Sequence, residues 1–269
     1  MRKLEIREIQ AMLLDLMKIV HQFMSDNQLD YYLLGGSALG AIRHNGFIPW
    51  DDDIDIGMKR DDYERFIKIS DKFDKQYEVV NLWNERNCDY GLTRIYINNT
   101  KIDNPSISKT KLDKRLYFDI FPLDNVPDEA EELSKFEKKI VKNKWLIQMI
   151  DYRFYGNSIL KKMARKALSI ALQPFRKNIL CSFDRLMKKY RESETEKICS
   201  LCSQYSFSKQ VMAKSVYGVP TLHKFEDSEF YIPKDYNSYL TTLFGNDYME
   251  IPPESKRRKG YAIYKLDEE

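Results

Sequence analysis

Hydrophobic and polar positions along this chain recur with two different periods, and these periods predict its elements. Apolar residues at helical spacing predict an amphipathic helix over 4–27 and another over 61–74. Between the first two strand-like segments, SALGAIRHNG predicts a short helix with Ser37 as its N-cap. We expect Pro122 to stop the last strand. The strand-like segments are 31–36, 53–58, 77–83, 90–100 and 115–124.

Strands and helices alternate over the first part of the chain, 1–125, which predicts an α+β (α/β) core with a mixed sheet flanked by helices. From Asp128 to about Lys189 the pattern becomes helical and basic, which predicts a helical C-terminal extension. Residues 205–269 are rich in Tyr, Pro and short polar turns. Because no linker separates 1–125 from 126–269, we expect one continuous structural unit.

The composition is that of a globular protein, with 43% hydrophobic and 32% charged residues among 269. A net charge of +3 gives no case for a nucleic-acid partner. Charged residues interrupt the first twenty positions, which argues against a signal peptide, and no apolar run is long enough for a membrane span. We therefore expect a cytoplasmic protein with reduced cysteines. The single Cys199-Ser-Leu-Cys202 pair is weak support for zinc.

Four aspartates crowd the start of the second strand-like segment, in DDDIDIG. Side chains alternate along a strand, so Asp53 and Asp55 share one face with Asp51, while Ile54 and Ile56 anchor the other. Carboxylates so close together repel one another unless a cation offsets their charge, and Mg²⁺ or Mn²⁺ suits oxygen ligands. The alternative is a solvated acidic turn after Pro49-Trp50.

A third carboxylate is expected on a later strand, because in two-metal chemistry the metal ions flank the reacting phosphate and stabilise the attacking and leaving oxygens. Asp119 in LYFDIFPLD lies among apolar residues, where a lone carboxylate is costly without a partner. Asp124 is the second candidate, although its position after Pro122 is more typical of a loop.

The glycine turn before the carboxylates predicts an anion site. Gly35 and Gly36 allow backbone N–H groups to approach a phosphate, and the following helix directs its N-terminus toward it. Arg43 suits a bidentate phosphate contact, and His44 could contact phosphate or substrate. The alternative for both is that they are cations at a helix C-terminus, where the helix dipole favours positive charge.

These motifs together resemble a known family. A glycine turn after a strand, a short helix, D-h-D-h and a later acidic strand residue resemble the nucleotidyltransferase fold of polymerase beta-type enzymes. More narrowly, GGSALGAIRHNGFIPWDDDIDIGMKRDDYERF is similar to the first motif of the LicD family of phosphotransferases. YFDIFPLD resembles its second motif, and YIPKDYNSYLTTLFGNDYMEIPP resembles its C-terminal block.

The resemblance implies transfer of phosphocholine from CDP-choline to a sugar hydroxyl of a cell-surface glycan, such as teichoic acid or lipopolysaccharide. Fukutin-type relatives imply ribitol phosphate instead. The catalytic and metal-binding residues would be Asp53, Asp55 and Asp119, with Asp119 as base or as ligand only. The second part of the chain would complete the active site. The donor phosphate would be held by Gly35, Gly36, Ser37 and Arg43.

One departure concerns the C-terminal block, because PPESKRRKGYAIY lacks the His that family members often carry there. The candidate substrate contacts are His44, Trp50, Asp52, Arg257 and Arg258. Two alternatives stay open: a nucleotidyltransferase that moves NMP from an NTP to a small acceptor, and an inactive relative that acts as a binding subunit. The two enzymes would share the metal site and differ in product, whereas the binding subunit would keep only the fold.

Residues 159–175 have an apolar stripe opposite four basic residues. A basic amphipathic helix of this kind can lie on an anionic membrane, which would suit a lipid-linked acceptor at the inner face of the plasma membrane. The alternative is an ordinary surface helix that packs its apolar stripe on the core.

Overall fold

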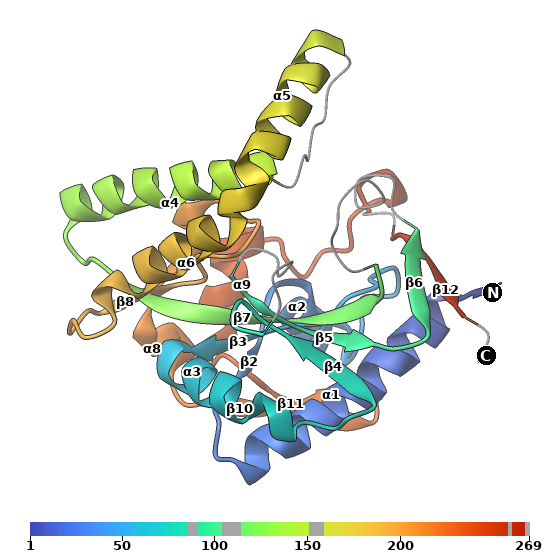
Figure 1. Cartoon of the computed structure of the whole chain (residues 1–269). Helices are drawn as coiled ribbons and strands as arrows, with labels where there is room; N and C mark the ends of the chain where they lie inside the picture. Colours follow the sequence, from blue (N-terminus) through green and yellow to red (C-terminus); the bar gives the residue numbers. More distant parts are fainter. Residues whose placement is uncertain (85–90, 104–113, 151–158, 258–259, 267–269) are drawn as a thin grey trace.

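A computed structural model of the chain describes residues 1–84, 91–103, 114–150, 159–257 and 260–266 (Figure 1). It confirms the predicted α+β class with a mixed central sheet. In that sheet, β3 and β7 run parallel and their other neighbours run antiparallel. The strand order is β2-β3-β7-β5-β4, with β8 paired to β7 and β9 to β8. The strands are β2 (Tyr32–Leu33), β3 (Asp55–Lys59), β4 (Tyr77–Val80), β5 (Thr93–Ile97), β7 (Leu116–Val126), β8 (Lys197–Cys199) and β9 (Val211–Ala213).

Two smaller sheets complete the β structure of the described residues. One has the order β1-β12-β6, formed by Arg2–Lys3, Ala262–Lys265 and Thr100–Asp103, and therefore joins both ends of the described chain. The other is the hairpin of β10 (Thr221–Phe225) and β11 (Ser228–Ile232).

Helices pack on both sides of the central sheet, with α1 and α3 below it and α4 and α6 above it in Figure 1. A capping box between Glu5 and Glu8 begins α1, whose apolar face enters the larger of two hydrophobic cores. The smaller core lies between α4, α6 and the sheet. The helices are α1 (Ile6–Asp26), α2 (Gly35–His44), α3 (Arg60–Ile69), α4 (Ala130–Ile150), α5 (Ile159–Leu172), α6 (Arg176–Met187), α7 (Phe207–Gln210), α8 (Lys214–Tyr217) and α9 (Tyr236–Phe244).

The helical extension predicted after the first part of the chain covers α4 to α6, and strands return from Lys197 onward. Helix α5 projects from the body at the end of α4 (Figure 1). Of the helices that the structure describes, none is both long and apolar enough to cross a bilayer.

Two local predictions are wrong. Helix α2 begins at Gly35 with Leu34 as its N-cap, so Ser37 lies inside the first turn. Pro122 does not stop β7, which continues to Val126. On one side of β7 the pairing with β5 ends at Ile120 and the pairing with β8 begins at Asp124. Pro122 lies in this gap, where a missing N–H costs no ladder hydrogen bond.

Candidate active site

Three charged residues lie side by side across the middle of the sheet. Asp55 of β3 is the register partner of Asp119 of β7, and Asp119 is in turn the partner of Arg94 of β5. Register partners on adjacent strands project from the same face. The fold thus brings together two of the three predicted catalytic carboxylates and adds an arginine that the motifs did not indicate.

Arg94 holds Asp119 in place. Its Nε donates to Asp119 Oδ1 at 2.7 Å, and its guanidinium lies 4.0 Å from the centroid of the Tyr117 ring. Planar stacking and a charge-assisted hydrogen bond both restrict an arginine side chain. The ion pair with Arg94 therefore offsets part of the desolvation cost of placing the Asp119 carboxylate in an apolar strand.

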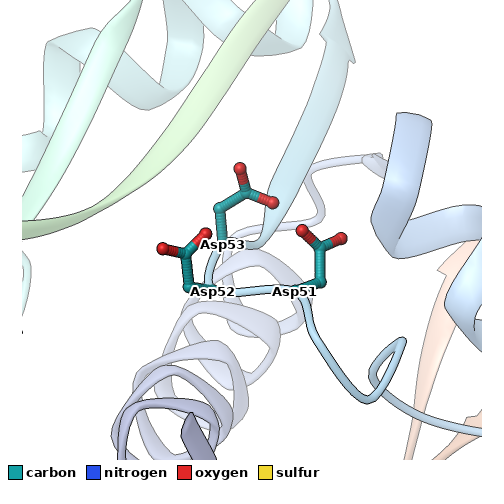
Figure 2. A group of neighbouring side chains, drawn as sticks. All are labelled: Asp51, Asp52 and Asp53. Atoms are coloured by element: carbon teal, nitrogen blue, oxygen red, sulfur yellow. The ribbon is translucent and has the colours of Figure 1, made fainter. Parts of the chain in front are cut away.

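The remaining predicted carboxylate, Asp53, belongs to a second group. Asp51, Asp52 and Asp53 place carboxylate oxygens within 4.8 Å of one another. Figure 2 shows their side chains rising from one stretch of chain, with Asp53 between the other two. Ile54 and Ile56 are buried as the alternation predicted, while Asp51, Asp53 and Asp55 are half-buried.

Asp52 has a separate contact. Its side chain is buried and its Oδ2 accepts the backbone N–H of Tyr261 at 2.9 Å. A Cβ added to Gly260 would lie 2.7 Å from the same oxygen. Asp52, expected as a substrate contact, therefore ties the C-terminal segment to the carboxylate loop.

The glycine turn packs directly on this loop. A Cβ at Gly36 would lie 2.7 Å from Asp51 Oδ2, so any larger residue would displace that carboxylate. The N–H of Gly35 (φ +51°) donates to the hydroxyl of buried Tyr239 at 2.9 Å. Ser37 Oγ accepts the N–H of Asp55 at 2.9 Å. The glycine turn and the carboxylate strand are thus held together by direct packing and by hydrogen bonds.

Arg43 and His44 lie at the other end of α2. Arg43 Nη1 donates to the carbonyls of Tyr248 and Glu250, and its Nε donates to His44 Nε2 at 3.0 Å. These contacts give Arg43 a structural role beside the predicted phosphate contact. Burial, together with the charge of Arg43, lowers the pKa of His44 below its usual value.

The predicted substrate contacts His44, Trp50 and Arg257 come together. The His44 ring meets the Trp50 ring edge-on, with 6.3 Å between the two centroids. The Arg257 guanidinium lies 4.3 Å from the centroid of the same Trp50 ring. Arg257 Nε also donates to the Pro252 carbonyl. Arg258 lies outside the described residues.

Asp124, the second candidate for the later carboxylate, takes part in a buried ion pair. Both of its oxygens accept from Arg60, from Nε and Nη2, at 2.7 Å each. Asp184 of α6 lies 3.4 Å from the same arginine. The residue therefore links β7 to the start of α3 and to α6.

Several residues of the site could not be found from the motifs. Tyr239 lies more than 200 positions from the glycine it contacts, and Gln10 of α1 donates to the carbonyls of Ile48 and Asp51. Arg94 had one local signal, because a cation in a half-apolar strand needs a buried partner.

A cavity of about 280 Å³ lies between α4, the end of β8 and α7. The Tyr205 side chain lines it and would lie 3.8 Å from a Cβ at Gly35. Its walls include Trp145, Lys144 and Ser200, and the buried Ser200 Oγ has no hydrogen-bond partner among the described residues.

The carboxylate face can hold a hard cation, because oxygen donors are the ligands that Mg²⁺ and Mn²⁺ prefer. Within the described residues, the aspartates 51–53 are the group of acidic, His or Cys side chains close enough to share an ion. Asp55 and Asp119 lie next along the same face.

Comparison with known proteins places this site in a wider context. Residues 28–160 match the family model described as LicD/FKTN/FKRP, nucleotidyltransferase domain. The chain is 29% identical over 96% of its length, and over 96% of the other chain, to the lipopolysaccharide cholinephosphotransferase LicD of Haemophilus influenzae. Over 32 residues, 12% of this chain and 6% of the other, it is 56% identical to the human ribitol 5-phosphate transferase FKRP.

Proposed function

The chain belongs to the LicD family, and from this premise we propose that it transfers phosphocholine, or a related phospho-alcohol, from a CDP-activated donor to a sugar hydroxyl of a cell-surface glycan. The observation that carries the proposal is similarity along 96% of both chains to a protein named as a lipopolysaccharide cholinephosphotransferase. Lipopolysaccharide and teichoic acid are the two acceptor types to compare. The transfer would take place in the cytoplasm, at the inner face of the plasma membrane.

The reaction we propose is an in-line displacement at the choline-bearing phosphorus of CDP-choline. The acceptor oxygen forms the new P–O bond, the bond to the bridging oxygen breaks, and CMP leaves with that electron pair. The acceptor hydroxyl gives up its proton, and Asp119 is positioned by Arg94 as a candidate to receive it. Positioning and electrostatics supply most of the rate enhancement in such transfers.

Asp53, Asp55 and Asp119 are the proposed ligands of Mg²⁺ or Mn²⁺, and the proximity of Asp51 adds it to that set. Half-buried Asp51 and Asp53 bring carboxylate oxygens close enough to share such an ion, and Asp55 and Asp119 are register partners on the adjoining strands. When bound, the ion offsets negative charge that develops on the phosphate oxygens. Gly35 and Gly36 would approach the donor phosphates, and His44, Trp50 and Arg257 would contact the remainder of the donor.

The acceptor sugar would enter through the cavity that Tyr205 shares with the glycine turn. Trp145 offers a ring on which a sugar can stack, and Lys144 and Ser200 offer polar atoms. Trp145→Ala should raise the KM for the acceptor and leave the KM for CDP-choline unchanged. An equal effect on both KM values would indicate that the acceptor binds outside this cavity.

The test is release of CMP from CDP-choline with Mg²⁺ or Mn²⁺ and a glycan acceptor, beside CDP-ethanolamine, CDP-ribitol and CDP-glycerol. We expect metal-dependent release that is lost in Asp53→Asn. Asp71→Asn, which changes an exposed aspartate far along the chain from the motif, is the matched control and should retain activity. Pyrophosphate release from an NTP would favour nucleotidyl transfer instead, and silence with every donor would favour a binding subunit.

A further inference from the structure

Helix α5 contacts the body of the protein through its polar side. Ser169 is its one buried residue among those described, and its Oγ donates to the carbonyl of Ile150 at 2.6 Å. Gln173, just after the helix, donates to the same carbonyl at 3.0 Å. These contacts fix α5 to the C-terminal end of α4.

The apolar side of α5 faces outward. Successive residues of a helix are separated by about 100°, which places Ser169 among Lys162, Arg165 and Lys166. The apolar side begins about 80° from Ser169, at Ile159, and has Leu160 directly opposite Ser169. The exposed fractions on that side are 73% for Ile159, 80% for Leu160, 65% for Met163 and 64% for Ile170. The expected alternative, a stripe packed on the core, is therefore not what the structure shows.

The charge of the chain is concentrated in the same region. From 152 to 183 there are seven Lys or Arg residues and no Asp or Glu, which leaves 37 basic and 41 acidic residues elsewhere. On the helix, Lys166 and Lys161 lie at the two edges of the apolar arc. From there their ammonium groups can reach past the apolar surface to anionic head groups.

We propose that α5 is a membrane-docking helix, whose apolar face enters the head-group region of an anionic bilayer while its polar face stays bound to α4. Helices with a basic polar face and exposed Leu, Ile and Met bind such surfaces in the plane of the membrane. Figure 1 shows α5 projecting from the molecule, so a flat surface can reach it without meeting the central sheet.

A second copy of the chain is a less suitable occupant of this face. A symmetric dimer places the same patch against itself and would bring two sets of lysines together. Like charges at an interface cost several kcal/mol, whereas each Lys or Arg near an anionic leaflet is favourable. The positive charge of this face therefore favours an anionic bilayer over a second copy of the chain.

The experiment is flotation of the full chain with vesicles of phosphatidylethanolamine and phosphatidylglycerol, beside vesicles of phosphatidylcholine alone. We expect flotation with the anionic vesicles that weakens at high salt. Leu160→Glu with Met163→Glu should reduce partitioning by at least about tenfold, because both apolar burial and the favourable charge are lost. Lys166→Gln should reduce it about fivefold.

Val219→Glu is the matched control, since Val219 is an equally exposed apolar residue outside α5 and should leave flotation unchanged. Circular dichroism would verify that each variant is folded. Absence of flotation for the wild-type chain, or equal flotation for the double variant, overturns the proposal. A dimer that dissociates in the double variant without any vesicle binding would assign the face to a second copy.

Membrane docking adds to the proposed function by bringing the enzyme to a lipid-linked acceptor, but the two can fail separately. Flotation is measured without a donor, and CMP release is measured with a water-soluble acceptor and no vesicles. A docked protein that releases no CMP would leave the inference standing and refute the function. An active protein that never floats would do the reverse.

Discussion

Two aspartates of the same strand, β7, each pair with an arginine from another element, and the two pairs differ in their relation to the candidate site. Asp119 pairs with Arg94, and Asp124 pairs with Arg60, at the same shortest distance of 2.7 Å. Five positions separate the two aspartates, so strand alternation directs them to opposite faces of the sheet. The side chains of the first pair are each 12% exposed, whereas those of the second are 5% and 1% exposed.

The surroundings of the pairs explain this difference. Arg60 also lies near Asp184 and Glu64, and Lys188 bridges these two carboxylates, so the second pair is part of a network enclosed by α3 and α6. The first pair instead has Asp55 as its neighbour on β3. Identical chemistry therefore encloses one carboxylate within the fold and, at the other position, orients the carboxylate that we propose acts on substrate.

Removal of the enclosed carboxylate should have the largest effect. Asp124→Ala leaves the Arg60 charge buried without its bidentate partner, and we expect a loss of about 3–5 kcal/mol in the free energy of unfolding. Urea denaturation followed by circular dichroism measures it. Asp61→Ala, which breaks an exposed pair with Arg191, should cost under about 1 kcal/mol. Similar losses in the two variants would show that enclosure does not matter.

Substitution of the other β7 aspartate, Asp119, should lower the rate of CMP release more than the stability of the fold. Asp119→Asn keeps an oxygen for Arg94 but loses the negative charge, so we expect CMP release to fall about 10²–10³-fold. The free energy of unfolding should change by about 1 kcal/mol. A variant that loses stability as Asp124→Ala does, while retaining its rate, would reverse the assignment of the two pairs.

Arg94 itself should have a smaller effect. In Arg94→Met the carboxylate of Asp119 loses its orienting donor, and we expect kcat to fall about tenfold. Removal of a positive charge beside the carboxylates should also strengthen Mn²⁺ binding, measured by calorimetry, by a few-fold. A purely structural role for Arg94 would leave Mn²⁺ affinity unchanged.

The adjacent residues Asp51 and Asp52 allow a carboxylate at the candidate site to be compared with a structural carboxylate in the same loop. Gly36→Ala and Gly260→Ala each place a Cβ 2.7 Å from a carboxylate oxygen, that of Asp51 and that of Asp52 respectively. We expect the first to lower CMP release about tenfold, because Asp51 packs on the glycine turn that we propose holds the donor phosphates. The second should mainly loosen the C-terminal segment, seen as faster hydrogen exchange at Tyr261. Equal kinetic losses would place both carboxylates in the site.

Arg43 has carbonyl and imidazole partners, and its neighbour His44 should show the smallest effect. Burial and the Arg43 charge lower the pKa of His44, so folding favours the neutral ring. Its contribution to stability is complete above the usual histidine pKa of about 6.5 and declines as pH falls below it. The free energy of unfolding of the wild type should therefore decline more steeply in that range than that of His44→Gln. Parallel curves would contradict the assignment.

The sequence predicted the parts of the fold that rest on local periodicity. The alternation of Ile54 and Ile56 with aspartates placed the carboxylates on a common face, and the apolar context of Asp119 implied a charged partner. The partner itself, Arg94, depends on strand register, which the sequence does not show. Ser37 was misplaced because α2 already begins at Gly35, and the Ser37 hydroxyl accepts the N–H of Asp55 on the next strand instead of capping the helix.

The prediction for 159–175 left two alternatives because periodicity shows that a helix has an apolar face but not what that face meets. Only the position of Ser169 against Ile150 shows that the apolar face is directed outward. Pro122 illustrates the same limit, since its tolerance within β7 depends on where two neighbouring strands end.

The small sheet of β1, β12 and β6 also has a consequence for the order in which the protein is made. Residues 264 and 265 pair with residues 3 and 2, and Tyr261 supplies the N–H that Asp52 accepts. A ribosome has therefore synthesised the carboxylates and the glycine turn long before the segment that secures Asp52 emerges. A nascent chain released before residue 261 would carry the motif without this closure, so the charged loop is completed only after residue 261 has been added.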